Sequence, residues 1–117
     1  MRELPTHFPT RAHLLVCTGP RCRERGAGPL FERLWQDLEQ RRIAYYRSGG
    51  NVRLTSSGCQ GGCSFGPNAL AYARGEDGRL REAWYARQDL ASLTRLAEAL
   101  QDGAPLPAHG RYDDPER

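Results

Sequence analysis

The sequence contains no lysine. All 17 of its basic residues are arginine, and 14 acidic residues leave a formal net charge of +3. Arginine carries a planar guanidinium suited to two-point contacts with carboxylates or phosphates. The acidic residues are interspersed among the arginines, however, so the chain lacks the continuous basic stripe that marks nucleic-acid binding. We therefore expect no nucleic-acid partner, and we attribute the missing lysine to a GC-rich coding bias.

Long apolar runs are also missing. No stretch approaches the ~18 apolar residues that a membrane-spanning helix requires. Residues 1–10 hold two prolines and lack the apolar segment of a secretory signal. We therefore predict a cytoplasmic protein with no membrane partner. At 117 residues, one domain over 11–103 is expected between a flexible leader (1–10) and a flexible tail (104–117) that holds three prolines.

Cysteine is scarce as well, with four in the chain. They form two pairs: four residues lie between Cys17 and Cys22, and three lie between Cys59 and Cys63. In a reducing compartment such pairs are more typical of metal binding or catalysis than of structural disulfides. Thiolates are soft ligands that suit an iron–sulfur cluster or zinc. The function therefore depends on whether the fold brings the two pairs together.

Short apolar and alternating runs predict four strands, at 13–17, 52–55, 69–74 and 80–86. An Asp-Gly step joins the last two as a hairpin. The first β-α-β unit implies a parallel pair, to which the hairpin adds antiparallel strands. The order predicts an α/β fold of thioredoxin-like type, a small mixed sheet with helices packed on it.

Two periodic runs predict helices. The first begins near Pro29 and reaches about Tyr46, with Trp35 in its apolar face. The second covers 90–100, with Asp89 in its first turn and Gly103 beyond its end. Trp84 and Tyr85 should point to opposite faces of their strand, so that one is in the core and the other is exposed.

Each cysteine pair follows an expected strand. Cys17 ends the first, and Cys22 is expected in the loop after it. The second loop is rich in glycine, which lets a backbone close around a metal group and direct N–H groups at sulfur. These glycines are Gly58, Gly61, Gly62 and Gly66. Phe65 and Pro67 are expected to shield one side of the site from water.

A [2Fe–2S] cluster takes four thiolates, two for each iron. Local pairs suit this requirement, so Cys17 and Cys22 are expected to hold one iron while Cys59 and Cys63 hold the other. His13 could serve as a Rieske-like ligand, but four cysteines already complete the site, and a histidine within the sheet is the better interpretation.

The residues around both pairs resemble the thioredoxin-like [2Fe–2S] ferredoxins, a family related to the ferredoxin-like subunit of respiratory NADH dehydrogenase. The resemblance covers about residues 12–103, and both pairs fall on the family's ligand positions. It rests on Leu14-Leu15-Val16-Cys17-Thr18-Gly19, on Arg53-Leu54-Thr55-Ser56-Ser57-Gly58-Cys59 and on Cys63-Ser64-Phe65-Gly66-Pro67.

The resemblance implies a [2Fe–2S] cluster and a one-electron carrier between a protein donor and a protein acceptor. It implies no enzymatic activity and favours a homodimer. As a hypothesis, three arginines in the loop around Cys22 form a basic rim that docks an acidic partner. These are Arg21, Arg23 and Arg25.

Two alternatives stay open. A structural zinc-binding module uses the same soft ligands, although C-x4-C lies at the edge of zinc spacing. A thiol–disulfide oxidoreductase is suggested by the fold, although its usual C-x-x-C is absent. Visible absorption separates the first alternative from a cluster, because zinc proteins are colourless and [2Fe–2S] proteins are red-brown.

Overall fold

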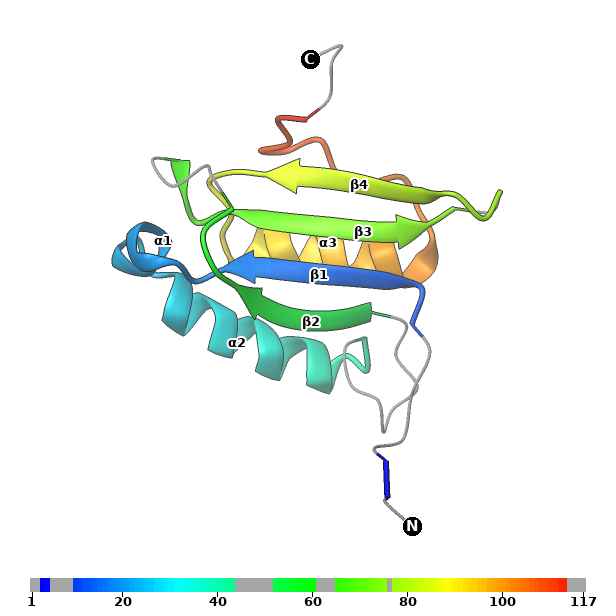
Figure 1. Ribbon diagram of the computed structural model, residues 1–117, viewed down its shortest axis with the longest axis horizontal. Helices are drawn as coiled ribbons and strands as arrows, with labels where there is room; N and C mark the ends of the chain where they lie inside the picture. The colour runs from blue at the N-terminus through cyan, green and yellow to red at the C-terminus, as the bar shows by residue number, and fades with distance from the viewer. Residues whose placement is uncertain (1–2, 5–9, 44–51, 61–64, 76, 114–117) are drawn as a thin grey trace.

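A computed structural model describes residues 3–4, 10–43, 52–60, 65–75 and 77–113. These ranges hold β1 (Ala12–Cys17), α1 (Pro20–Glu24), α2 (Ala27–Gln40), β2 (Val52–Ser57), β3 (Ala69–Arg74), β4 (Leu80–Tyr85) and α3 (Leu90–Asp102). The strands form one sheet in the order β2-β1-β3-β4, with β1 and β2 parallel and the other neighbours antiparallel (Figure 1). The predicted mixed α/β arrangement is confirmed.

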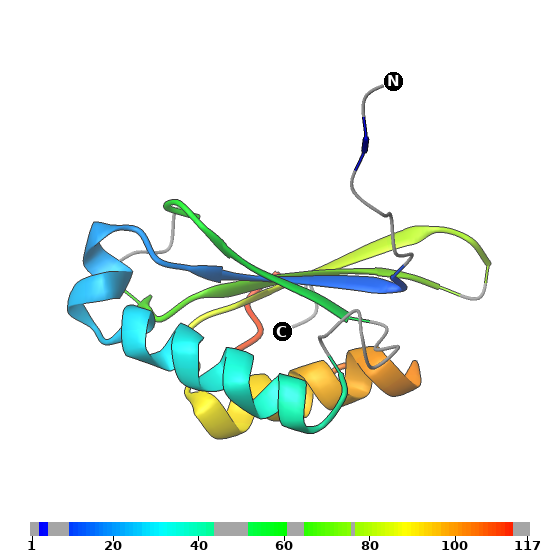
Figure 2. The ribbon, with the colours of Figure 1, turned by 90° about the horizontal axis from the view of Figure 1, so that it is seen from below.

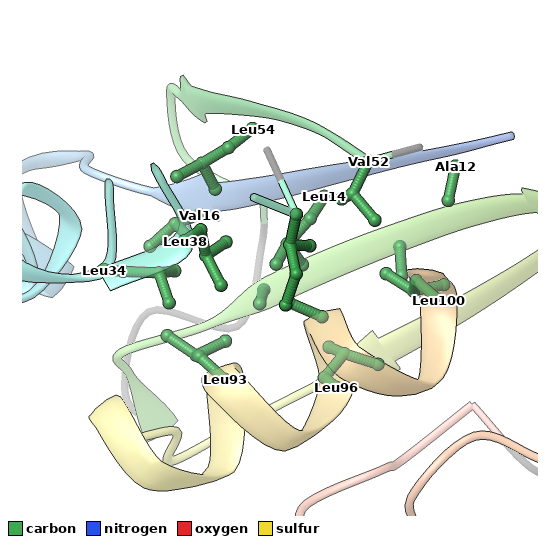
Figure 3. Close-up of a cluster of buried hydrophobic side chains, with 14 of the residues drawn as sticks. Ala12, Leu14, Val16, Leu34, Leu38, Val52, Leu54, Leu93, Leu96 and Leu100 are labelled. Carbon is green, nitrogen blue, oxygen red and sulfur yellow. The ribbon is translucent and has the colours of Figure 1, made fainter. Parts of the chain in front are cut away.

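Helices α2 and α3 both lie on one face of the sheet (Figure 2). Alternation along β1 explains this, because Ala12, Leu14 and Val16 project from that face and are buried. Leucines of the two helices are buried against them, and each contributes about 1.5–3 kcal/mol relative to an exposed position. These leucines are Leu34 and Leu38 of α2 and Leu93, Leu96 and Leu100 of α3 (Figure 3).

Helix α3 begins and ends at the residues that the sequence indicates. The Asp89 carboxylate accepts from the Ser92 backbone N–H at 2.8 Å, and the Ser92 hydroxyl accepts from the Asp89 N–H at 2.9 Å. This reciprocal pair satisfies two donors that a helix start leaves open. Gly103 follows the helix with φ +67°, a conformation that favours glycine.

Helix α2 differs from its prediction at its end and on its outer face. It ends at Gln40 rather than near Tyr46, and Arg42 turns the chain with φ +60°. Tyr46 itself lies outside the described residues. Trp35 is 41% exposed, so the prediction that it belongs to the core is wrong. It lies about 100° around the helix from Leu34, which is the residue that faces the core.

Residues after α3 lie along β4. The Tyr85 hydroxyl donates to the Pro107 carbonyl at 2.8 Å, and the Tyr112 N–H donates to the Trp84 carbonyl at 3.0 Å. Arg111 forms an antiparallel bridge with Tyr85. The domain limits and the flexibility expected for 104–117 stay predictions, and these bonds place part of that segment on the sheet edge.

Tyr85 and Trp84 point to opposite faces of the sheet as expected, but neither is fully exposed. Tyr85 is 1% exposed within the core, whereas Trp84 is half-buried on the other face of the sheet. No helix of the described part of the chain is long and apolar enough to cross a membrane.

Candidate metal centre

The first cysteine pair lies at one end of the sheet, where β1 stops and α1 begins. Pro20 starts α1 at a position where its missing N–H has no cost. Cys22 therefore sits in a short helix, and the prediction of a loop at this residue is wrong. The turn of helix brings Cys22 back towards Cys17. Both thiols are 0% exposed and form a small buried cluster with Ala27.

The second loop begins at the same end of the sheet, where β2 stops next to β1. In the parallel pair of β1 and β2, Cys17 lies opposite Ser57, two residues before Cys59. The Thr18 N–H donates to the Ser57 carbonyl at 2.9 Å and extends this pairing past the strands. Parallel neighbours end at the same edge, which is why loops far apart in sequence start side by side. Cys59 is exposed, in contrast to the first pair.

Gln60 ties the second loop to the sheet. Its side-chain Nε2 donates to the Leu15 carbonyl at 3.2 Å and to the Ser57 hydroxyl at 2.9 Å. Leu15 belongs to β1, so this side chain connects the loop after β2 to the strand that carries Cys17. Sequence patterns gave no signal for this contact, because it joins residues 45 positions apart.

Two glycines show how closely the loops approach each other. A Cβ placed on Gly66 would lie 2.7 Å from the Cys22 Sγ, which is too close for any real contact. A Cβ on Gly19 would lie 3.1 Å from the Cys59 backbone nitrogen. Glycine is therefore required at 66 and favoured at 19 because the two cysteine loops touch. A Cβ placed on Gly58 would have no atom within 4 Å, so close packing does not require glycine at this position.

The donor set suits a cluster of two irons. Within the described residues, no three His, Cys, Asp or Glu side chains gather as they would around one metal ion. Cys63 lies outside those residues, as do Gly61 and Gly62. The remaining three cysteines lie on two touching segments, the end of β1 with α1 and the loop after β2, and Gly19 and Gly66 stand where these segments touch. Soft sulfur donors in local pairs are what a [2Fe–2S] cluster takes.

His13 is not at this site. Its Nε2 lies 2.8 Å from the Thr55 hydroxyl, so it joins β1 to β2 within the sheet, as the sequence suggested. Burial lowers the pKa of His13, and the positive charge of Arg53 lowers it further.

Two aromatic residues lie close to the cysteines. Phe65 is 54% exposed, with the Arg87 guanidinium 5.5 Å from its ring centre, so it is a surface residue next to Gly66. Burial raises the pKa of the Tyr112 phenol, and electrostatic interactions with Asp113 and Cys17 act in the same direction. The segment after α3 therefore lies within electrostatic reach of Cys17.

Solved structures of a thioredoxin-like [2Fe–2S] ferredoxin from Aquifex aeolicus are similar to this one. The wild-type structure matches with a TM-score of 0.59 at 22% identity, over 82% of this chain and 91% of that chain. Another matches with a TM-score of 0.63 at 19% identity, over 92% and 98%. A Cys-to-Ser variant reaches 0.65 at 18% identity, over 88% and 99%.

This chain has the fold of those ferredoxins. At such identities the likeness concerns the fold alone, and the [2Fe–2S] cluster is a property of the Aquifex protein. No protein-family model matches the sequence, and no curated protein matches it either.

Proposed function

We propose that the protein is a one-electron carrier that holds a [2Fe–2S] cluster and passes electrons between protein partners, with no chemistry on a substrate. The ligands would be Cys17, Cys22, Cys59 and Cys63. The observation that supports this best is the contact between the two cysteine loops, at Gly66 with Cys22 and at Gly19 with Cys59. A bound cluster of this kind accepts and returns a single electron.

The two loops would have different tasks. Cys17 and Cys22 are fully buried, so they would keep water away from their half of the site. Cys59 is exposed and would leave the other half close to the surface, where a partner protein can exchange an electron. We therefore expect electrons to enter and leave on the Cys59 side, which α1 borders, because Gly19 directly before α1 lies against Cys59.

Anaerobic purification tests the proposal. We expect a red-brown protein with two irons and two acid-labile sulfides in each chain. A colourless protein with bound zinc would instead support the structural zinc module. A metal-free protein that reduces a disulfide substrate would support the oxidoreductase alternative.

The docking rim has a physical basis in α1. Arg21, Arg23 and Arg25 are exposed around the buried Cys22, and none of them forms an ion pair with another described residue. Unpaired charge next to a redox centre raises the encounter rate with a partner of opposite charge, by about 10-fold to 1000-fold at low salt. An acidic electron-transfer partner fits this surface.

Charge removal tests the rim. Replacing the three arginines by glutamine should slow electron transfer to an acidic partner at least about tenfold at low ionic strength and remove most of its salt dependence. The matched control replaces three arginines at the β3–β4 hairpin, at the opposite end of the sheet (Figure 1), and should change little. These control residues are Arg74, Arg79 and Arg81. Equal electron-transfer rates in the two triple variants would show that the arginines around Cys22 do not dock the partner.

The homodimer stays a prediction. Light scattering, which measures the mass of the protein in solution, tests it.

A further inference from the structure

Asn68 is a buried amide without a hydrogen-bond partner. It stands directly before β3 and is 1% exposed. Neither its Nδ2 nor its Oδ1 meets a partner among the described residues. An apolar side chain of the same shape would suit a buried position better, because an unpaired buried amide loses its bonds to water without replacement. The presence of asparagine here therefore requires a physical reason.

The register of the sheet places Asn68 opposite Cys17. Val16 pairs with Ala69 in the antiparallel ladder of β1 and β3. The Cys17 N–H donates to the Asn68 carbonyl at 2.9 Å, which continues the ladder by one step. Opposite residues of such a ladder project from the same face, with Cβ atoms about 4.5–5.5 Å apart. The unpartnered amide therefore belongs to the immediate surroundings of the Cys17 thiol.

A second buried amide shows what the fold does when an amide is structural. Gln88 is 4% exposed, and its Nε2 donates to the Ala86 carbonyl at 2.9 Å and to the His109 carbonyl at 3.2 Å. It holds the segment after α3 on the end of β4. Asn68 is buried to the same degree but makes no such bond. The difference points to a partner for Asn68 that is a bound group rather than a protein atom.

We infer that Asn68 is a positioning residue of the proposed cluster site, whose Nδ2 donates a hydrogen bond to a sulfur of the loaded site. This inference rests on the proposed function. A donor to sulfur favours the reduced state, which carries more negative charge, and so raises the reduction potential. The amide would thus set the potential at which the protein gives up its electron.

The test compares Asn68→Leu with Gln88→Leu in the cluster-loaded protein. Asn68→Leu removes the donor and keeps a branched side chain of similar shape, and Asn68→Ala removes the donor with no added bulk. Both should lower the potential, with a three- to tenfold change in the ratio of oxidised to reduced protein at a fixed potential. For one electron this is about 30–60 mV. Gln88→Leu should lower thermal stability and leave the potential unchanged.

The outcomes separate the two proposals. If the wild-type protein contains no iron and sulfide, both the cluster and this role of Asn68 are wrong. If the wild-type protein is loaded but Asn68→Leu and Asn68→Ala keep its potential, only the role of Asn68 is wrong. An equal fall in potential in Gln88→Leu would also overturn it, because the effect would then follow from the loss of any buried amide.

Discussion

The two cysteine loops reach the same end of the sheet by different means. In the first, Cys17 ends a central strand and Cys22 lies in α1, and both thiols are buried. In the second, Cys59 is exposed, and the loop is held by the Gln60 side chain on one side and by the bond from the Arg87 N–H to the Phe65 carbonyl, 2.7 Å, on the other. The first pair is thus part of the fold itself. The second is held in place by hydrogen bonds that join its loop to other segments.

Alanine in place of a cysteine tests this difference most strongly. Cys22→Ala and Cys59→Ala should both lose the cluster, because alanine offers no donor to iron. Cys22→Ala should also lower the stability of the cluster-free protein by about 1 kcal/mol through a buried cavity, which is about 4 °C in Tm. Cys59→Ala should leave that Tm unchanged, since its side chain is exposed.

Iron content and thermal unfolding of the cluster-free variants measure both effects. Equal losses of Tm would mean that the second loop is as much a part of the fold as the first. Full iron content in either variant would remove that cysteine from the ligand set.

Gly66 and Gly58 provide a matched pair within the second loop. Gly66→Ala places a Cβ 2.7 Å from the Cys22 Sγ, so the loops must move apart. We expect a loss of about 1–3 kcal/mol from overpacking and less than half the wild-type iron content. Gly58→Ala meets nothing within 4 Å and should behave as the wild type. Similar iron content in the two variants would show that the close approach at Gly66 has no role.

Local patterns predicted most of the fold. The four strands, the hairpin and both ends of α3 follow from alternation, turn residues and capping, all of which are properties of short segments. The end of each parallel strand also located the cysteine loops. Helix α1 was missed because five residues show no period, and Trp35 was misplaced because an aromatic next to an apolar stripe can lie outside it.

The contacts between the loops could not be predicted in this way. Gly19 belongs to one of the motifs that carry the resemblance, but the motif does not reveal its contact with Cys59, and Asn68 becomes informative only when Cys17 is placed beside it. Gly66, in a glycine-rich loop, was expected to matter, but its reason is a thiol 44 positions away in the chain rather than a local turn. Tertiary contact, not propensity, decides these positions.

Gln60→Met should weaken the second loop alone. Methionine has a similar length but cannot donate to the Leu15 carbonyl. The free energy that holds the second loop against the sheet should therefore fall by about 0.5–1.5 kcal/mol. This corresponds to about a two- to tenfold faster release of the cluster to a chelator, with global unfolding little changed. Gln36→Met, on the exposed side of α2, is the control. Should Gln60→Met lower the unfolding free energy as much as it speeds cluster release, the loop and the fold would be one unit.

The smallest expected effect concerns the two strands beneath both loops. The folded-state pKa of His13 is below its value of about 6.5 in an unfolded chain, because burial and the charge of Arg53 oppose protonation. Between those two pKa values the unfolded chain binds more protons, so stability falls as the pH drops below about 6.5 and levels off below the folded pKa.

His13→Gln keeps a polar partner for Thr55 but does not titrate. Its unfolding free energy should therefore lack this part of the pH dependence between pH 7 and 5, as urea titrations at several pH values would measure. The carboxylate of Asp89, whose pKa the Ser92 N–H lowers, loses its contribution only at more acidic pH. If the unfolding free energy depends on pH equally in the wild type and in His13→Gln, protonation of His13 does not affect the stability of the β1–β2 pair.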